Sequence, residues 1–252
     1  MAPLSRIERA YRVRIKPKRY VPLLEHCGIV FSEPMTLAGY GESPRPRNFV
    51  HMGLKGLSRD LQAALDYILL DDTSAPEPVL VGHSSGGGLA QYAIVNSNPD
   101  DEPLVSGLVL LGSTPPFGMR RVLAAWVRLD PWSLPRFLWN MGDVRSLLST
   151  PLLVRRAYFG PHTPQTDVQE FFDRDMNHEE TVSWMQGMMF RYVDPKNVKA
   201  KVPEGRVLCV AADRDALITP DIARDTASEY GVGVTFVRGA GQFSFISSSS
   251  VT

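Results

Sequence analysis

The stretch from Pro78 to Ala90 constrains the fold of this chain more than any other. It reads PVLVGHSSGGGLA and holds a Gly-x-Ser-x-Gly pattern at Gly82, Ser84 and Gly86. An apolar run precedes the pattern, and an apolar segment of helical character, Leu89–Val95, follows it. This order predicts a strand, a tight turn at Ser84 and a helix. We expect glycines on both sides of the serine, because strand and helix approach too closely there for a Cβ.

The turn also predicts a chemistry. The hydroxyl of Ser84 would stand exposed at the start of the helix as a nucleophile, and the backbone N–H of Ser85 would stabilise an oxyanion. The alternative is a Gly/Ser-rich loop without a catalytic role. The apolar segments on both sides favour the nucleophile.

Strand and helix patterns alternate along the chain, which predicts an α/β fold with a mostly parallel sheet and helices on both faces. A helix pattern earlier in the chain, about Ser58 to Leu70, places Leu57, Leu61, Leu65 and Ile68 on one side. A later helix would start at Thr219 and Pro220 and stop at Gly231. The strand candidates are Ile29–Phe31, Pro78–Val81, Gly107–Leu111, Val207–Ala211 and Val232–Val237.

Residues 113–201 differ in amino-acid composition from the rest of the chain. All four tryptophans lie there, together with many phenylalanines and methionines, and their spacing is helical. We interpret the segment as a helical insertion between two strands. Most of its aromatic side chains would bury the insertion against the sheet; alternatively, some would roof an apolar ligand pocket. The tryptophans are Trp126, Trp132, Trp139 and Trp184.

Composition excludes several function classes. The 252 residues carry 27 basic and 27 acidic side chains, and this neutral balance argues against a general nucleic-acid binder. No run is long and apolar enough to predict a membrane span. Two cysteines, Cys27 and Cys209, make no disulfide framework and have no ligand spacing around them. We therefore expect a reducing, cytoplasmic compartment, no metal and no cofactor.

The first twenty residues are basic, with seven Lys or Arg against Glu8 alone. We interpret them as a solvated terminus with a short strand at Tyr11–Ile15. An organelle-targeting or anionic-surface segment is the alternative.

Several of these stretches together resemble the α/β-hydrolase superfamily, the esterase- and lipase-like serine hydrolases. Besides the serine turn, Leu23–Phe31 and Leu37–Pro44 resemble a helix, the fourth strand and the Gly-x-Gly-x-Ser loop of the family. Ala211–Pro220 resembles its penultimate strand with the acid of the catalytic triad. The resemblance implies a core of residues 21–112 and 202–241 and a helical cap of residues 113–201, flanked by the basic segment 1–20 and a serine-rich tail, 242–252.

The same resemblance assigns roles. Ser84 matches the nucleophile and Asp215 the acid that orients a histidine. Asp213 competes with Asp215, although the acid in such loops usually directly precedes the small-apolar-Pro run. Both aspartates have the alternative role of capping the helix that starts near Pro220. His83, adjacent to the serine, would point elsewhere and would not be the base.

The position of the triad histidine is occupied by Gln242, in the sequence Gly239-Ala240-Gly241-Gln242. None of the five histidines follows Asp215, and a glutamine amide does not take a proton near neutral pH. Without a base, Ser84 stays a weak nucleophile. His178 and His162, both in the insertion, are candidates for a replacement base, although each is expected in an exposed position.

Two hypotheses explain the pattern's break at Gln242. In the first, the chain is a degenerate hydrolase. In the second, the ends of the given sequence, which are truncated relative to the family on both sides, differ from those of the functional protein, for example through translation into an intron. The leading functional hypothesis is hydrolysis of an ester or related acyl bond of an apolar small molecule. A catalytically inactive binding protein is the alternative, and cofactor-free haloperoxidase-like or C–C hydrolase chemistry is a third.

Overall fold

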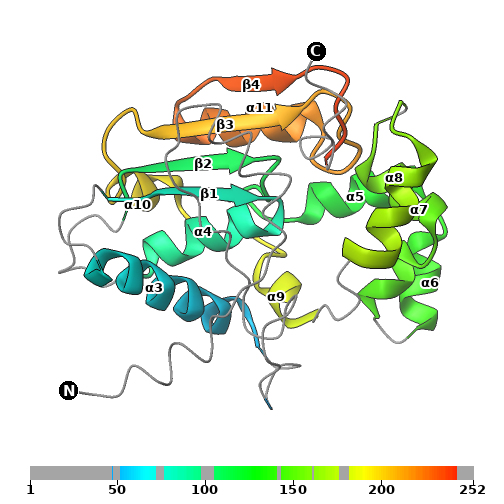
Figure 1. Cartoon of the computed structure of the whole chain (residues 1–252), viewed down its shortest axis with the longest axis horizontal. Helices are drawn as coiled ribbons and strands as arrows, with labels where there is room; N and C mark the ends of the chain where they lie inside the picture. Colours follow the sequence, from blue (N-terminus) through cyan, green and yellow to red (C-terminus); the bar gives the residue numbers. More distant parts are fainter. Residues whose placement is uncertain are drawn as a thin grey trace.

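The computed structural model describes residues 47, 52–71, 77–97, 105–140, 143–160, 162–175 and 182–242. Within them, four strands form one parallel sheet in the order β1-β2-β3-β4 (Figure 1). The strand candidates near residues 11–15 and 29–31 lie outside the described residues. The others are confirmed with small shifts of their ends. The strands are β1 (Val79–His83), β2 (Gly107–Leu111), β3 (Val207–Ala212) and β4 (Val234–Val237).

The predicted helices around the sheet are also present. Helix α3 (Leu54–Asp71) begins before the predicted start and buries Leu57, Leu61 and Leu65, as their spacing indicates. Helix α4 (Ser85–Val95) follows β1 directly. Helix α11 (Pro220–Tyr230) has Pro220 in its first turn and ends at Gly231, whose φ of 70° is left-handed.

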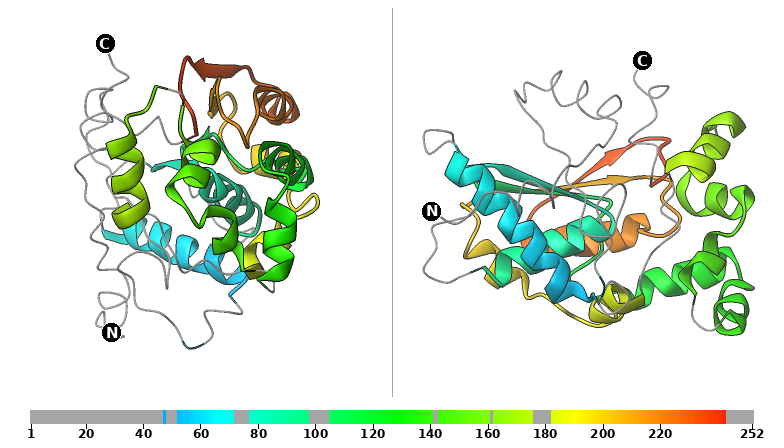
Figure 2. Two further views of the ribbon diagram at one scale, coloured as in Figure 1. Left: turned by 90° about the vertical axis from the view of Figure 1, so that its right-hand side faces the viewer. Right: turned by 60° about the horizontal axis from the view of Figure 1, so that its bottom comes forward.

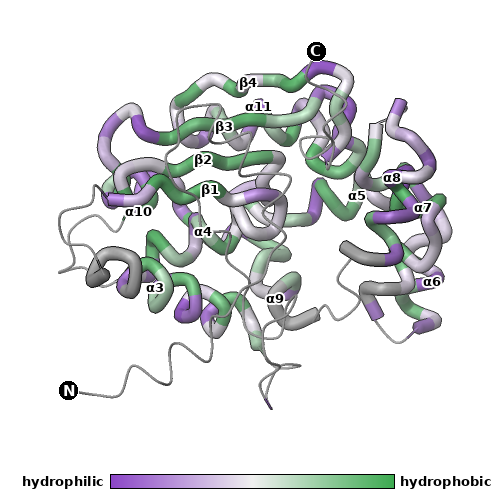
Figure 3. The backbone as a smooth tube through the Cα atoms, in the orientation of Figure 1, coloured by the Kyte–Doolittle hydropathy of each residue, from purple (hydrophilic) through white to green (hydrophobic). Residues whose placement is uncertain are grey.

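Helices α4 and α11 pack on the same face of the sheet, and α3 packs against α4 (Figure 2). This face carries Leu108, Leu110 and Ala211, which are buried. The strands are hydrophobic along most of their length (Figure 3). On the opposite face, Val79 is 56% exposed and Leu208 46% exposed. The prediction of helices on both faces is therefore met on one face only within the described part of the chain.

A series of helices lies between β2 and β3. The strands point toward α5 to α8 of this series, so the carboxyl ends of the strands face it (Figure 1). None of the described helices is long and apolar enough to cross a bilayer. The series consists of α5 (Arg120–Leu129), α6 (Ser133–Trp139), the 3₁₀ segment η3 (Val144–Leu148), α7 (Pro151–Tyr158), α8 (Gln165–Glu170), the π segment η4 (Phe171–Asp175), α9 (Val182–Gly187) and α10 (Pro195–Lys199).

The aromatic residues of this insertion divide into two groups. Trp126 is half-buried against the core, as expected, and Met188 is fully buried. Trp132 and Trp139 are exceptions to the expectation that most aromatic side chains bury the insertion, because they are 70% and 90% exposed. Helix α6 packs on its neighbours through other side chains, so these two indoles project outward. The side chain of Trp184 lies outside the described residues.

Strand β1 meets α4 in a tight turn at Ser84, with φ 51° and ψ −123°. Within the described residues, Ser84 is the one non-glycine residue with a positive φ, a conformation that costs an L-residue energy. A Cβ on Gly82 would lie 2.5 Å from the Cα of Gly87, and one on Gly87 would lie 2.2 Å from the Oγ of Ser113. The expectation that Gly86 is needed for close approach is wrong: a Cβ there meets nothing within 4 Å.

These distances predict opposite effects for neighbouring glycines. Gly82→Ala and Gly87→Ala should each lower the free energy of unfolding by about 3 kcal/mol or more, because backbone or a fixed Ser113 side chain has to shift. Gly86→Ala should leave stability unchanged or raise it by up to about 1 kcal/mol, because alanine favours the helix. Urea unfolding measures all three variants. A loss of stability in Gly86→Ala equal to that in Gly82→Ala would contradict the close-packing explanation.

Candidate active site

The hydroxyl of Ser84 lies at the carboxyl end of β1, where it is half-buried. The backbone of this residue is fixed from two sides. Its N–H donates to the carbonyl of Leu111 at the end of β2 (3.1 Å), and its carbonyl accepts from the N–H groups of Gly87 (3.1 Å) and Thr114 (2.9 Å). The turn is therefore held by both β2 and α4, and the side chain has little freedom to move away from the strand ends.

Gln242 occupies the position next to this hydroxyl. Its Nε2 donates to the Oγ of Ser84 over 2.7 Å, and the residue is 2% exposed. The carboxamide oxygen, Oε1, is buried and has no hydrogen-bond partner. The structure thus brings together Ser84 and the residue at the expected histidine position, although these residues lie far apart in the chain.

His83 contacts the same loop through its ring. Its Nε2 lies 3.0 Å from the backbone oxygen of Gln242, and a carbonyl only accepts, so this nitrogen carries the proton. Burial lowers the pKa of His83, which favours the neutral ring. His83 thus fixes the main chain of Gln242, in agreement with the expectation that it does not serve Ser84 as a base.

The two aspartates of the loop after β3 have different partners. The Oδ1 of Asp215 accepts from the backbone N–H groups of Leu217 and Ile218, both at 2.8 Å. Asp213 instead accepts from the N–H of Gly239 at 2.7 Å, and so ties its own loop to the one that carries Gln242. This bond gives Asp213 a role in holding the loop and leaves Asp215 as the buried carboxyl.

Asp215 is 4% exposed, and its second oxygen, Oδ2, is buried without a hydrogen-bond partner. Burial raises the pKa of this carboxyl to about 7, although the two backbone donors act in the opposite direction. An oxygen of this kind is the acceptor that the ring N–H of a triad histidine requires. In this chain both Oδ2 of Asp215 and Oε1 of Gln242 are hydrogen-bond acceptors. While the carboxyl is ionised, no hydrogen bond forms between these two oxygens.

The remaining predicted site residues are placed as follows. Ser85 is the first residue of α4 and is half-buried, so its N–H lies at the positive end of that helix. His162 is exposed in a loop of the insertion. His178 lies outside the described residues, as do His26 and His51. Within the described part of the chain, no group of His, Cys, Asp or Glu has the arrangement of a metal site.

A buried polar cluster behind the turn was not predicted from the sequence. Gln91, fully buried on α4, has its Nε2 at 3.0 Å from the carbonyls of Gly87 and Thr114 and at 3.1 Å from the Oγ of Ser113. Its Oε1 accepts from the hydroxyl of Tyr230 on α11 at 2.8 Å. The cluster connects α4, β2 and α11. The one signal for it in the sequence is a glutamine among the apolar residues of α4.

The loop of Gln242 also touches the insertion. A Cβ on Gly241 would lie 2.6 Å from the backbone nitrogen of Gly160, just after α7. Three half-buried aromatic rings adjoin this contact: Tyr158 and Phe159 each meet Phe171 edge to face, at 6.2 and 5.4 Å between ring centres. We call these three rings the aromatic trio. The backbone of Tyr158 and Phe159 is part of the contact with the loop of Gln242, and Phe171 packs on the rings of both.

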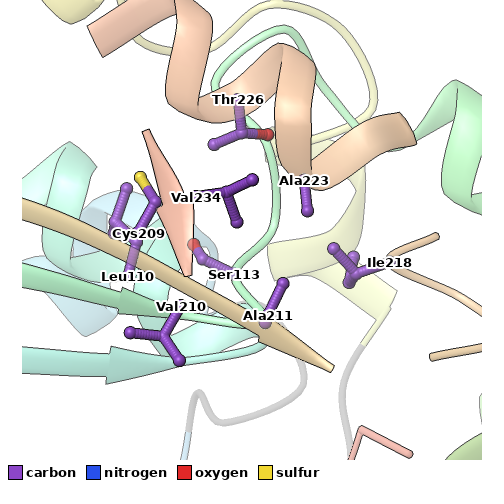
Figure 4. A pocket seen from close by; sticks show the side chains of 10 residues that line it. Leu110, Ser113, Cys209, Val210, Ala211, Ile218, Ala223, Thr226 and Val234 are labelled. Carbon is purple, nitrogen blue, oxygen red and sulfur yellow. The ribbon is translucent and has the colours of Figure 1, made fainter. Parts of the chain in front are cut away.

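A small internal space lies between the sheet and α11 (Figure 4). Its lining is mostly aliphatic, with Ser113 and Thr226 as polar members and the buried thiol of Cys209. Burial raises the pKa of this thiol to about 11. Ser84, Asp215 and Gln242 do not line the space, although Ile218, whose N–H donates to Asp215, does.

The comparison with known proteins agrees with this arrangement. Residues 19–250 match the model of the alpha/beta hydrolase family. The chain belongs to the alpha/beta hydrolase family. No curated protein matches it.

Solved structures with the same fold include enzymes of several kinds. A thermophilic esterase from Thermogutta terrifontis is 16% identical, with 83% of this chain and 72% of that chain covered and a TM-score of 0.57. A bromoperoxidase from Bacillus anthracis is 17% identical, with 81% and 72% covered and a TM-score of 0.58. MenH from S. aureus is 18% identical, with 85% and 77% covered and a TM-score of 0.55. At these identities the likeness concerns the alpha/beta hydrolase fold.

The raised pKa of Asp215 makes stability depend on pH. The folded protein holds a proton on this carboxyl up to about pH 7, whereas an unfolded aspartate loses it near pH 4. The free energy of unfolding should therefore fall by about 4 kcal/mol as the pH rises from about 4 to 7. Asp215→Asn keeps an acceptor for Leu217 and Ile218 and should remove this contribution.

Urea unfolding at several pH values, with wild type and Asp215→Asn compared at each, measures the effect. The comparison is needed because His83, with its lowered pKa, contributes with the opposite sign. Its contribution to the free energy of unfolding grows as the pH rises from its folded pKa to its unfolded pKa and is constant above that. Asp213→Asn is the matched control and should retain the decline. An equal decline in wild type and Asp215→Asn would rule out this carboxyl as the source.

Proposed function

We propose that this chain carries an acyl-transfer site of the serine hydrolase type, which attacks an ester or related acyl bond of a small apolar molecule through Ser84 and turns over slowly. The observation that carries the proposal is the left-handed turn at Ser84, whose Oγ lies 2.7 Å from the side chain of Gln242. A hydroxyl held in this way has the position that a nucleophile requires.

The proposed roles follow from the contacts. In the proposed reaction, Ser84 Oγ forms the bond to the acyl carbon and its proton passes to water, while the N–H of Ser85 stabilises the oxyanion that develops on the carbonyl oxygen. The C–O bond of the ester then breaks, and the leaving alcohol takes a proton from water. A water molecule hydrolyses the acyl-enzyme, which releases the acid and restores Ser84. Asp215 occupies the position of the triad acid, and its unpartnered Oδ2 is the oxygen that a histidine would use. His83 and Asp213 position residue 242, by bonds to the backbone of Gln242 and Gly239.

The slow turnover follows from the chemistry of Gln242. A carboxamide donates a hydrogen bond to Ser84 but does not accept its proton, so general-base catalysis is lost. In serine proteases, the oxyanion site and binding alone still leave roughly a 10³–10⁴-fold acceleration over water. We therefore expect weak activity toward activated esters and none that requires a strong nucleophile.

Restoring a histidine tests the proposal. In Gln242→His, the imidazole would reach Ser84 from the place of the present amide and would offer its other N–H to Asp215. Labelling by a fluorophosphonate probe and hydrolysis of p-nitrophenyl butyrate should then rise roughly 10²–10⁴-fold. Wild type should be labelled slowly and Ser84→Ala not at all, as mass spectrometry of the labelled peptide would show.

The control is Gln242→Met, which has similar length but neither base nor hydrogen bond, and which should gain no activity. If Gln242→His folds with an unchanged melting temperature and is still not labelled, Ser84 is not an acyl-transfer nucleophile. If Gln242→His is labelled and wild type is not, the second candidate function applies.

That second candidate is a catalytically inactive binding protein with an alpha/beta hydrolase fold. It is favoured by one observation: a neutral amide rather than a base is bonded to Ser84 and almost fully buried. Such a site would hold the acyl group or a similar ligand without breaking a bond.

The aromatic trio supports the apolar character of the substrate. Tyr158, Phe159 and Phe171 adjoin the loop that positions Gln242, so a substrate held at Ser84 would place its acyl chain near these rings. Tyr158 ends α7, Phe159 follows it directly and Phe171 begins η4, so all three rings belong to the insertion. The insertion would then act as a cap over the nucleophile, in line with its position beyond the strand ends.

Removing one ring tests this assignment. In the Gln242→His background, Phe171→Ala should raise KM for p-nitrophenyl octanoate roughly tenfold through lost apolar contact and leave KM for the acetate within about twofold. Phe190→Ala is the control, because its ring is 66% exposed and packs near Arg120 instead. Equal changes for both esters would contradict the acyl-chain contact without affecting the role of Ser84.

A further inference from the structure

Helix α6 of the insertion exposes apolar side chains and buries a polar one. Its one fully buried residue is Ser133, whereas Leu134 and Leu138 are 51% and 66% exposed. These leucines are four residues apart and share a face of the helix. Trp132 just before α6 and Trp139 at its end are 70% and 90% exposed. Leaving two indoles and two leucines in water has a free-energy cost that a soluble surface rarely bears.

We call Trp132, Leu134, Leu138 and Trp139 the α6 surface. It lies at the outer end of the insertion, where α6 is remote from the strands in both views (Figures 1 and 2). The indoles are too exposed to line the space over Ser84, so the α6 surface is independent of the proposed acyl-transfer site.

The exposed charges in the segment from 120 to 160, which contains α6, have one sign. Among the described residues from 120 to 160, every charged side chain that is exposed is an arginine: Arg120, Arg121, Arg128 and Arg156. Arg121 is paired with Asp225, but Arg128 and Arg156 have no carboxylate partner among the described contacts. The carboxylate nearest in sequence to α6, that of Asp130, is buried and paired with Arg136.

We propose that the α6 surface docks the protein on a membrane surface that contains anionic lipids. Tryptophan prefers the boundary between headgroups and acyl chains, and leucines beside it insert their apolar side chains. Arginines around such a surface are attracted to anionic headgroups. The exposed apolar side chains therefore match the apolar interior of a bilayer, and the arginines match its negative surface.

A second copy of the chain fits less well. In a twofold dimer the same surface meets itself, so Arg128 and Arg156 of both copies would be brought together without carboxylates to pair with. An acidic polypeptide would satisfy the arginines, but the strongly exposed indoles project singly and do not form a groove for a helix or strand. The lipid surface is the partner that accommodates both features.

Vesicle sedimentation with the full chain tests the proposal. Wild type should bind vesicles of phosphatidylcholine with phosphatidylglycerol at least tenfold more tightly than vesicles of phosphatidylcholine alone. The double variant Trp132→Ser/Trp139→Ser should weaken binding to the anionic vesicles at least tenfold, and Arg128→Glu at least threefold. Indole fluorescence of wild type should shift to shorter wavelength on binding, since Trp132 and Trp139 would leave water.

Matched controls separate this surface from other basic or apolar residues. Arg59→Glu makes the same charge change on α3, and Phe190→Ser removes an equally exposed aromatic ring outside α6. Both should bind anionic vesicles within twofold of wild type. Circular dichroism and melting temperature should be unchanged in every variant, because the altered side chains are exposed.

The remaining outcomes each overturn the proposal. Absence of binding to anionic vesicles excludes lipid docking, and binding that is unchanged in the tryptophan double variant excludes the α6 surface. A concentration-dependent dimer that the double variant abolishes would assign this surface to self-association. Binding to polyglutamate with the same dependence on the tryptophans, without vesicle binding, would assign it to an acidic protein partner.

Discussion

The contact between Gly82 on β1 and Gly87 on α4 is the constraint on which the site depends. Because no side chain separates the two backbones, α4 starts directly behind the strand, and the one intervening residue, Ser84, is forced into a left-handed conformation. The strain is offset by the backbone hydrogen bonds of Ser84 with Leu111, Thr114 and Gly87 and by the buried amide of Gln91. A larger residue at either glycine would separate strand and helix and move the hydroxyl.

Around this turn, the proposed acyl-transfer site has contacts that would support a triad, with Gln242 at the place of the base. Asp213 and His83 hold the loop of Gln242 from two sides, and Asp215 keeps an oxygen free in a buried position. These contacts fix position 242 against Ser84 whatever side chain it carries. Because position 242 is buried, the choice between imidazole and carboxamide has a large effect. The carboxamide leaves its oxygen buried without a donor, which costs free energy, and it does not take the proton of Ser84.

The strands, the helix ends and the serine turn were predictable because local signals decide them: apolar runs, a proline and glycine at the ends of α11, and the spacing of Gly82 and Ser84. The same reasoning chose Gly86 over Gly87, since the sequence pattern does not contain distances. It assigned most aromatic side chains of the insertion to the interior, whereas α6 packs through Ser133 and Phe137 and leaves Trp132 and Trp139 outside.

The sequence by itself determined the fold class, the place of the tight turn at Ser84 and the lack of a histidine between Asp215 and Gln242, because each is a property of residue type and order. The tertiary structure alone decided that Gln242 meets Ser84, that Asp213 holds a loop while Asp215 is buried, and that Gln91 bonds Tyr230. These pairs lie up to 158 positions apart. Their contacts follow from the packing of strands and helices, which brings together residues that no local pattern relates.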